Sequence, residues 1–388
     1  MDAEGGPTIS AQEYRQRLQS VRDAVAALEL DTFLVWDKES IFYLTGAVYE
    51  NLERPFFILV RPARGDLLLV PELEREHMHK VPNITDVRSY FEFPAATGEG
   101  WEDLLATVLA PSDAVALEPS LPVDIYRRLS AICPNLSVHD LITELRLVKS
   151  DAEVAMIRRA ARYADMAIQR LLDVSRYGAS VAEVVAQMAP VAGKLVQDLG
   201  TEWDPLTTSM LTAPWAAPRS AQPHAIPRPD DLLKGGPHVA LNLTRAQGYS
   251  AECERTFFTS APSLREKELF TTMLQGRDVA FHMVRPGVPC ADIDAAVYDF
   301  LDSRGYAAPE VRLHRTGHGF GLSAHEGPWI AAGSEHVLAE NMVISVEPGI
   351  YLPEIGGVRH SDTVLVTKDG YERLTRTLTA LEDLTLAR

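Results

Sequence analysis

The sequence has few cysteines, and they are placed where neither crosslinking nor nucleophilic chemistry is expected. Only three occur in 388 residues, Cys133, Cys253 and Cys290, and they are widely spaced. This pattern fits neither a disulfide framework nor a zinc cluster, so a reducing cytoplasm is the expected environment. Cys253 lies between Glu252 and Glu254, whose negative charges disfavour a thiolate, and we therefore expect a packed, inert thiol.

Basic residues and long apolar runs are also scarce. The 37 lysines and arginines are outnumbered by 54 aspartates and glutamates, which gives a formal net charge of −17. Because no basic stretch offsets this charge, neither nucleic acid nor an anionic membrane surface is an expected partner. No apolar run reaches the length of a membrane span, and the acidic, polar N-terminus does not resemble a signal peptide. We expect a cytoplasmic protein with a small-molecule substrate.

The length of the chain exceeds one ordinary hydrophobic core, so two domains are expected. In the first third, short apolar runs predict buried strands and the stretches between them predict helices. The strands are expected at 32–36, 56–60, 67–70 and 114–119, and the helices at 101–109 and 122–132. This alternation predicts an N-terminal α/β domain over residues 1–146.

Residues 147–388 are expected to form a second, larger domain that mixes helices and strands. Ser150 can cap a long helix in which apolar residues recur at helical spacing from Val154 to Leu172. Further helices are expected at 181–199, 264–284 and 293–303, with strand-like runs between them. The proline-rich stretch 213–229 predicts a long ordered loop inside this domain.

Four segments of the second domain concentrate the acidic and histidine residues that carry chemistry. They are ALNLTRAQGYSAECERTFF (240–258), HRTGHGFGLSAHEGP (314–328), SVEPGIY (345–351) and GGVRHSDTVLV (356–366). A site for two divalent ions needs hard oxygen donors and a histidine, with at least one carboxylate bridging both ions. Together the segments have the outline of a two-metal hydrolase site.

In their order and spacing, these segments resemble the pita-bread domain of the creatinase, aminopeptidase P and prolidase superfamily. The N-terminal third resembles the smaller α/β domain of that superfamily more loosely. Its metallopeptidases carry two aspartates on adjacent strands, a histidine, and two glutamates as metal ligands. Matched position by position, this chain offers Asn242, Glu252, His318, Glu347 and Ser361.

Two of those matches replace a carboxylate with a neutral side chain. Neutral oxygens compensate the free-energy cost of dehydrating a divalent cation less well than carboxylates do. Creatinase, the metal-independent branch, also has asparagine at the first position and reads Glu-Arg-Thr, as in Glu254-Arg255-Thr256 here. The resemblance therefore implies a creatinase-like enzyme without stoichiometric metal and without another cofactor.

The same resemblance implies catalytic roles for His224, Glu254 and Glu347. Glu254 matches a catalytic glutamate of creatinase, and His224 matches the histidine that transfers protons there. Imidazole titrates near neutrality and can carry a proton from water to a leaving nitrogen. Carboxylates pair in bidentate fashion with planar cations, so the acidic residues would suit a guanidinium or amidinium substrate.

Further residues are expected to contact the substrate. They are Arg54, Tyr249, Glu252, His318, His325, Trp329 and Ser361. Creatinase has an arginine that binds the substrate carboxylate, eleven residues after the histidine that matches His318. In this chain that position is Trp329. A histidine of the creatinase pocket is likewise replaced, by Ser361. Both differences count against creatine as the substrate. The superfamily forms dimers in which an arginine of one subunit's N-terminal domain reaches the active site of the other subunit. Arg54 lies near the position of that arginine, so the resemblance implies a homodimer.

Three functions follow from these residues. The main expectation is metal-independent hydrolysis of a non-peptide C–N bond in a small amidine, guanidine or cyclic amide. The first alternative is a metal-dependent Xaa-Pro aminopeptidase or dipeptidase with a degenerate ligand set. The second is a non-catalytic binding protein of the same fold, against which the retention of His224 beside Glu254 and Glu347 argues. Metal analysis separates the first two.

Overall fold

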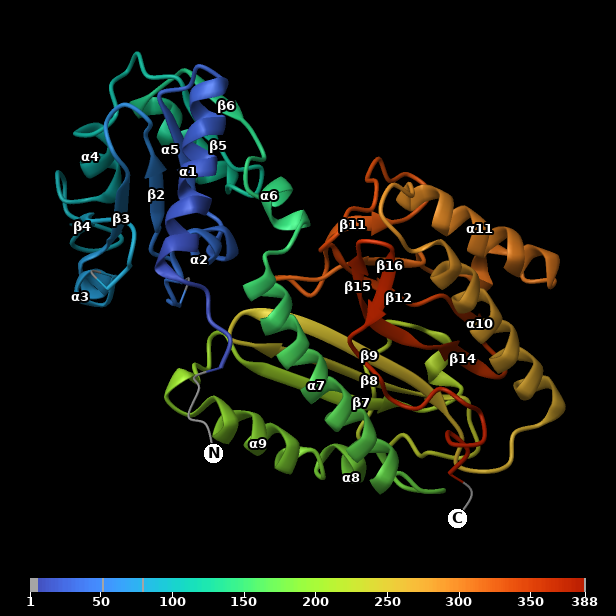
Figure 1. Cartoon of the computed structure of the whole chain (residues 1–388). Helices are drawn as coiled ribbons and strands as arrows, with labels where there is room; N and C mark the ends of the chain where they lie inside the picture. The colour runs from blue at the N-terminus through green and yellow to red at the C-terminus, as the bar shows by residue number, and fades with distance from the viewer. Residues whose placement is uncertain (1–5, 51, 79, 387–388) are drawn as a thin grey trace. The chain divides into compact units, whose positions relative to one another are not determined.

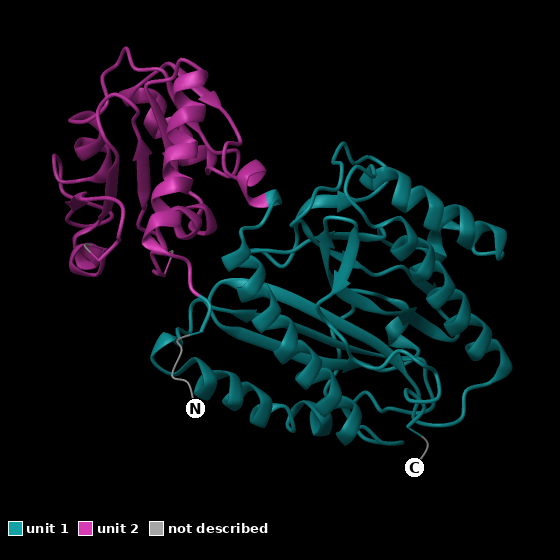
Figure 2. Cartoon of the chain, in the orientation of Figure 1, with its two compact units in different colours: residues 1–7, 147–388 teal, residues 8–146 magenta. Residues whose placement is uncertain are grey.

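The chain forms two compact units, each with its own sheet. The computed structural model describes residues 6–50, 52–78 and 80–386. Unit 2 is Thr8–Arg146, and unit 1 contains Leu147–Arg388 together with the start of the chain (Figure 2). Among the described residues, no helix has the length and apolar character needed to cross a membrane.

Unit 2 is built on a six-stranded sheet with the strand order β4-β3-β2-β1-β5-β6. Its strands are β1 (Thr32–Val35), β2 (Phe57–Val60), β3 (Leu67–Pro71), β4 (Asp86–Tyr90), β5 (Val115–Leu117) and β6 (Leu136–Val138). Its helices are α1 (Ala11–Ala27), α2 (Lys38–Thr45), α3 (Arg75–Met78), α4 (Trp101–Ala106), α5 (Val123–Ile132) and α6 (Thr143–Leu147). The four predicted strands and two predicted helices are all present, because short apolar runs bounded by turns are a strong local signal.

Helices α1 and α2 are among the elements of unit 2 that were not predicted from the sequence. In α1 only Arg17, Leu18, Val21 and Val25 are buried, so its apolar stripe is narrow. Its start is nevertheless encoded, because the hydroxyl of Ser10 accepts a hydrogen bond from the backbone of Glu13. Asp37 caps α2 in the same way. The capping residues, rather than the periodicity, were the available signal.

Unit 1 is built on a large sheet with the order β11-β10-β12-β15-β9-β8-β7, to which β16 adds beside β15, and a separate β13-β14 pair. Its strands are β7 (Ser209–Trp215), β8 (His238–Ala246), β9 (Tyr249–Phe257), β10 (Gly317–Gly319), β11 (Glu326–Ile330), β12 (Val343–Val346), β13 (Gly349–Leu352), β14 (Gly356–Arg359), β15 (Ser361–Thr367) and β16 (Gly370–Arg373). Its α-helices are α7 (Asp151–Val174), α8 (Val181–Val185), α9 (Ala189–Leu199), α10 (Leu264–Met283) and α11 (Cys290–Ser303).

The helices of unit 1 bury one face of this sheet. Helix α7 packs against β7, β8 and β9, and α8 and α9 pack against α7 (Figure 1). Helices α10 and α11 pack together; α10 contacts β12, β13 and β14, and α11 contacts β11. The predicted cap of α7 is confirmed, since Ser150 accepts from the backbone of Glu153 and the Glu153 carboxylate accepts from the backbone of Ser150.

Two sequence predictions in this unit are wrong in detail. The single helix expected at 181–199 is interrupted between α8 and α9. Pro190 lies in the first turn of α9, where its missing N–H costs nothing, but the same residue cannot continue a preceding helix. The stretch 213–229 is not loop throughout, because its first residues end β7 and Arg219–Ala221 form a short 3₁₀ helix.

Candidate active site

A cavity of about 370 Å³ in unit 1 gathers most of the predicted site residues. It is lined by Leu211, Trp215, Pro223, His224, Leu241, Leu243, Glu252, Glu254, His314, Arg315, His325, Glu347 and Arg359. Of the predicted residues, His224, Glu252, Glu254, His325 and Glu347 therefore lie in one pocket. They come from four separate segments of the chain, so only the folded sheet brings them together.

Strand β9 supplies two carboxylates because successive side chains of a strand point to opposite faces. Glu252 and Glu254 share the pocket face, and Cys253 between them packs into the apolar core on the other side. Burial and the charge of Glu347 raise the pKa of Glu252, and one of its carboxylate oxygens, Oε1, is buried without a hydrogen-bond partner. Such an orphaned acceptor is costly unless a cation or a ligand satisfies it.

His318 and Glu347 form a buried pair beside these acids. The His318 Nε2 and Glu347 Oε1 atoms are 3.1 Å apart, and the His318 Nδ1–H donates to the carbonyl of Gly319. Ser345 joins the two residues, since its hydroxyl donates to Glu347 and accepts from the backbone of His318. Burial lowers the pKa of His318, but the charge of Glu347 outweighs this and raises it above the usual value. The rings of His318 and His325, two of the residues expected to contact the substrate, lie together with their centroids 3.9 Å apart.

A second network crosses the pocket floor and involves residues that the sequence analysis missed. Arg359 makes a two-pronged ion pair with Glu254, in which Nη2 donates to Oε1 at 2.5 Å. The Arg359 Nη1 also donates to the hydroxyl of Tyr351, 3.3 Å away. That hydroxyl lies 2.6 Å from the His314 Nε2, while the His314 Nδ1 faces the carbonyl of Arg315 at 2.8 Å.

These contacts fix the state of His314. The Nδ1 atom must carry the proton to bond a carbonyl, so the Nε2 lone pair accepts from the hydroxyl of Tyr351. Burial, together with the charge of Arg359, lowers the pKa of His314 to about 4, against the opposing effect of Glu347. His314 is therefore neutral near pH 7, with both ring nitrogens engaged. Its position four residues before His318 in HRTGHG was the available sequence signal.

The structure corrects the matching of Asn242 to a ligand position. In the β8–β9 pairing Asn242 lies opposite Cys253, whereas Leu241 lies opposite Glu254 and Leu243 opposite Glu252. Residues directly opposite each other point to the same face of a sheet, so Asn242 faces away from the pocket. Its buried amide donates to Leu211 and Thr212 instead. The pocket-facing positions of β8 are leucines and donate nothing to an ion.

Ser361 does face the pocket side of the sheet, directly opposite Glu254 in the β9–β15 pairing. Its buried hydroxyl oxygen makes no hydrogen bond within the described part of the chain. Ser361 is not itself among the lining residues, and it lies beside Glu254 on the neighbouring strand β15. A hydroxyl at this point adds a neutral oxygen but no charge.

Three other predicted contact residues have different surroundings. Tyr249 is buried, donates its hydroxyl to Glu153 of α7 at 3.0 Å, and is not among the lining residues. Trp329 in β11 lies under the guanidinium of Arg315, 4.6 Å from the ring centroid. Arg54 belongs to unit 2, where it is ion-paired with Glu53 and Glu92.

The donors present can hold one divalent ion. Ligand atoms of Glu252, Glu254 and Glu347 lie within 4.8 Å of one another, and so do those of Glu252, His318 and His325. Carboxylate and imidazole donors together suit zinc, manganese or iron, and the unpartnered oxygen of Glu252 is free to bind. A second ion fits poorly, because β8 offers only leucines, Ser361 is neutral, and Glu254 is already paired with Arg359.

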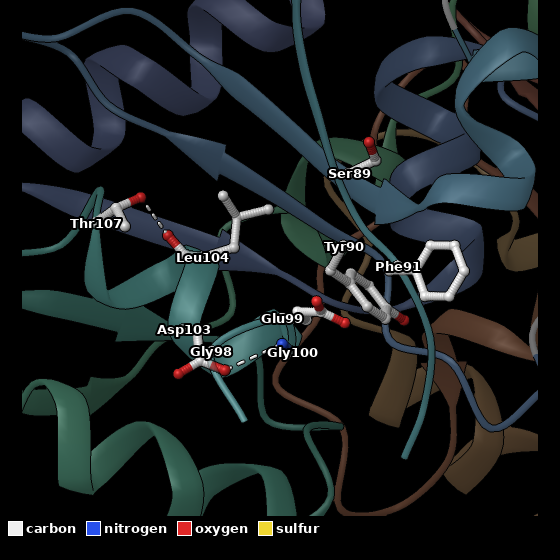
Figure 3. Close-up of a pocket in the computed structure, with 9 residues that line it drawn as sticks. All are labelled: Ser89, Tyr90, Phe91, Gly98, Glu99, Gly100, Asp103, Leu104 and Thr107. Carbon is white, nitrogen blue, oxygen red and sulfur yellow. Dashed lines mark hydrogen bonds between the residues drawn. The ribbon is translucent and has the colours of Figure 1, made fainter. Parts of the chain in front are cut away.

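A larger cavity, of about 520 Å³, lies in unit 2 and has no comparable chemistry (Figure 3). Its walls come from the end of β4 and the first turns of α4. Its acidic residues are Glu99 and Asp103, and the Asp103 carboxylate accepts a hydrogen bond from the backbone of Gly100 at the start of α4. That carboxylate is a helix cap, and no histidine lines the cavity, so the unit 1 pocket is the candidate active site.

Comparison with known proteins agrees with this assignment. The sequence model of Metallopeptidase family M24 matches residues 155–368, and that of the Creatinase/Prolidase N-terminal domain matches residues 17–148. The Xaa-Pro dipeptidase of Pyrococcus furiosus is 30% identical, over 94% of this chain and 98% of its own. The crystal structure of the prolidase from Pyrococcus horikoshii OT3 has a TM-score of 0.80 at 27% identity, covering 94% of this chain and 99% of its own.

These findings overturn the main functional expectation. A metal-independent, creatinase-like hydrolase of an amidine, guanidine or cyclic amide is wrong, because the similar chains are Xaa-Pro dipeptidases and the matching family is one of metallopeptidases. Asn242, which had been matched to a ligand position, does not face the pocket, whereas Glu252 has a ligand atom close to those of His318 and His325 and also close to those of Glu254 and Glu347. The first alternative, a metal-dependent Xaa-Pro peptidase, agrees better with the relatives.

The wider expectations are confirmed. The superfamily resemblance holds over both domains, and the fold is an N-terminal α/β domain followed by a pita-bread domain, as in the prolidase structures. The expectation of a hydrolase acting on C–N bonds is also confirmed, because that is the bond a peptidase cleaves. The family model covers more than half of the chain, and the chain belongs to Metallopeptidase family M24.

Proposed function

We propose that this chain hydrolyses Xaa-Pro dipeptides with the help of one divalent ion. The observation that carries the proposal is that Glu252 and Glu347 line a pocket of about 370 Å³, while His318 pairs with Glu347 and has a ring nitrogen within 4.8 Å of a Glu252 oxygen. A pocket of this size admits a small molecule rather than an extended polypeptide. The relatives named as Xaa-Pro dipeptidases support the choice of substrate.

Glu252, His318 and Glu347 would hold the ion. When bound, a divalent ion polarises a carbonyl oxygen and lowers the pKa of a coordinated water, which peptide hydrolysis requires. The remaining residues bind and orient the substrate. The Arg359 pair holds Glu254 against the pocket floor, and the apolar wall of Leu241, Leu243 and Trp215 suits a proline ring.

We propose that His224 carries the proton to the leaving nitrogen. It lies in the loop between β7 and β8, lines the pocket and is exposed, and its ring has no hydrogen-bond partner among the described residues. His314 is less suited, because the Tyr351 hydroxyl and the Arg315 carbonyl occupy both of its ring nitrogens. An imidazole open to both pocket and solvent can exchange its proton in each turnover.

The direct test combines metal content with dipeptide hydrolysis. The full-length protein, stripped with a chelator, is titrated with Mn²⁺, Zn²⁺ or Co²⁺, and release of proline from a set of Xaa-Pro dipeptides is followed. We expect activity that saturates near one ion per chain. Absence of hydrolysis for every Xaa-Pro dipeptide at every metal loading would contradict the proposal.

Replacing Glu252 with glutamine should separate metal binding from stability. We expect the Glu252→Gln substitution to weaken metal binding at least about 10-fold, because a charged donor is lost. The metal-free variant should be no less stable than the metal-free parent, since a buried carboxylate beside Glu254 and Glu347 is repulsive. Thermal unfolding with and without metal measures both effects, because a ligand that binds only the folded state raises Tm.

The matched control for that experiment is Glu268→Gln. Glu268 is an exposed residue of α10 that pairs with Arg265, and its loss should change neither metal binding nor Tm appreciably. A Glu252→Gln protein that keeps the metal-induced rise in Tm of the parent would remove Glu252 from the ligand set.

We also propose a cytoplasmic homodimer, with Arg54 contributing to the neighbouring site. The three cysteines, which form no disulfides among themselves, support the location. The dimer rests on the superfamily resemblance, and in the structure Arg54 is paired with Glu53 and Glu92 of its own unit. Sedimentation equilibrium at micromolar concentration tests the dimer. A fully active monomer would contradict it.

A further inference from the structure

The pocket residue His325 lies in a turn that the sheet does not fix by itself. The turn connects β10 to β11, and His325 is the last residue before β11. In the β10–β11 pairing His318 lies opposite Trp329, whereas the next residue of β10 lies opposite Glu326, so the register shifts at this point. A register shift interrupts the ladder and re-aims the neighbouring side chains. Backbone pairing alone therefore leaves the direction of His325 unspecified.

The turn is held instead by an ion pair between Glu326 and Lys149, two residues that are 177 positions apart in the chain. The Lys149 Nζ donates to the Glu326 Oε1 at 3.0 Å, and both side chains are buried. The Glu326 carboxylate also accepts from the backbone of Ser323 at 3.2 Å, within the same turn. A β-carbon at Gly321 would lie 2.2 Å from the Glu326 Oε1, so glycine at this position lets the carboxylate fold back over the turn.

Lys149 is fixed through its own backbone. Its N–H donates to the carbonyl of Asn341 at 2.9 Å, just before β12. The next residue, Ser150, caps the long helix α7. The ammonium group therefore approaches Glu326 from a rigid part of unit 1, and loss of either partner would leave an uncompensated buried charge.

The turn places the ring of His325 on a proposed metal ligand. The ring centroids of His318 and His325 are 3.9 Å apart, and His325 lines the pocket. His325 is also exposed, so its ring is not enclosed by packing and its position depends on the backbone of the turn. A contact that fixes residues 321–326 therefore fixes the ring as well.

We propose that Lys149 and Glu326 are positioning residues, which hold the turn so that His325 stays on His318 and reaches the substrate. Neither Lys149 nor Glu326 is among the residues that line the pocket. As a statement about turnover this deepens the proposed dipeptidase function and rests on it, whereas the placement of His325 can be tested alone. The effect of the pair on activity must pass through His325, and that distinguishes positioning from a general contribution to stability.

A double-mutant cycle tests this path. His325→Ala should lower kcat/KM for Ala-Pro, with Mn²⁺ bound, by roughly 10-fold, the worth of one hydrogen bond. Lys149→Met should lower kcat/KM by up to the same factor. Adding Lys149→Met to His325→Ala should lower it no further, because the two changes remove the same contact. Lys149→Arg keeps the charge and should retain most of the activity.

A second variant covers the case in which Lys149→Met does not fold. Lys149→Met/Glu326→Gln removes both charges, which is often close to neutral for stability. The amide then lacks its anchoring cation, so His325 should still be released, with the same non-additive loss in kcat/KM. Kinetics are measured below the Tm of every variant. Full activity in this double variant, or a loss that adds to that of His325→Ala, would overturn the proposal.

Lys194→Met is the matched control. Lys194 is an exposed lysine of α9 that pairs with Asp198 of the same helix. Its loss removes an ion pair of the same chemical type without touching the turn, so kcat/KM should be unchanged.

A crystal structure of Lys149→Met/Glu326→Gln separates this proposal from the function on which it rests. If the wild type hydrolyses no Xaa-Pro dipeptide, the proposed function fails. The positioning role then still stands if the His325 ring has left His318 in the variant while His318 keeps its contact with Glu347. It falls if the centroid separation of 3.9 Å is retained.

Discussion

The His224→Ala substitution is expected to lower kcat on an Xaa-Pro dipeptide by roughly 10²- to 10⁴-fold, with KM nearly unchanged. The ring of His224 lines the pocket without engaging another described side chain, so its removal deprives the leaving nitrogen of a proton without disturbing the acids. Binding should survive because the pocket acids and the apolar wall of Leu241, Leu243 and Trp215 are untouched. Steady-state kinetics at saturating metal measures the split between kcat and KM.

Two further variants test whether the loss of activity is specific to His224. His282→Gln, on the exposed side of α10, should retain full activity, because it lies outside the pocket. The Tyr351→Phe substitution removes the hydrogen bond to His314 and should have a smaller effect than His224→Ala, since His314 would then only reorient. Wild-type turnover in His224→Ala would show that the proton carrier is His314 or His325 instead.

The sequence was most informative where the site is made of local motifs. The short segments that contain Glu252, His318 and Glu347 place titratable residues within buried strands. Charged residues are rarely buried unless they are paired or bind a ligand, so these positions are conspicuous in the sequence. The apolar runs of unit 2 were equally readable, because four or five buried residues in a row between turns leave little choice but a strand. Both signals depend only on neighbours in the chain.

The motifs did not predict which side chains of β8 point into the pocket. Whether Asn242 or Leu241 points into the pocket depends on the register of β8 against β9, which a motif match does not contain. The register was nevertheless encoded in the turn. Gln247 and Gly248 have positive φ values of 49° and 89°, and this two-residue turn pairs Ala246 with Tyr249. Counting back from that turn places Leu241, and not Asn242, beside Glu254.

The interactions of Arg359, Tyr351, His314 and Arg315 had no comparable local signal. The four residues come from β14, β13 and the segment before β10, and their contacts exist only after the sheet and the β13–β14 pair have formed. A lone arginine in a sequence is most often a surface residue, so nothing distinguished Arg315 before its position on Trp329 was known. The candidate donors were therefore accessible from the sequence, whereas the network around Arg359 could be described only from the structure.

The Asp362→Asn substitution is expected to destabilise the folded chain by about 3–5 kcal/mol, because it removes the counter-ion of several buried cations. The fully buried carboxylate accepts from Arg255 at 2.7 Å, from Arg373 at 3.0 Å and from Arg277, and it also accepts from the hydroxyl of Thr375. Burial raises the pKa of Asp362, but the three arginines outweigh this and hold it well below its usual range. Its stabilising charge is therefore present above the unfolded pKa, near 4, and is lost only as the pH falls further.

The same cluster connects stability to the active site. Arg255 follows Glu254 on β9, and Asp362 follows Ser361 on β15. Asp362 pairs with Arg255 and also with Arg277 of α10, so its carboxylate links β9, β15 and α10. Loosening this junction should shift the strands that hold the pocket acids, so Asp362→Asn should lose activity at a temperature where it remains folded. Arg373→Gln is the matched control: its guanidinium is 30% exposed, and its loss should cost no more than about 1 kcal/mol. Urea unfolding measures both variants, and an Asp362→Asn midpoint equal to that of the parent would show that this cluster does not hold the two strands together.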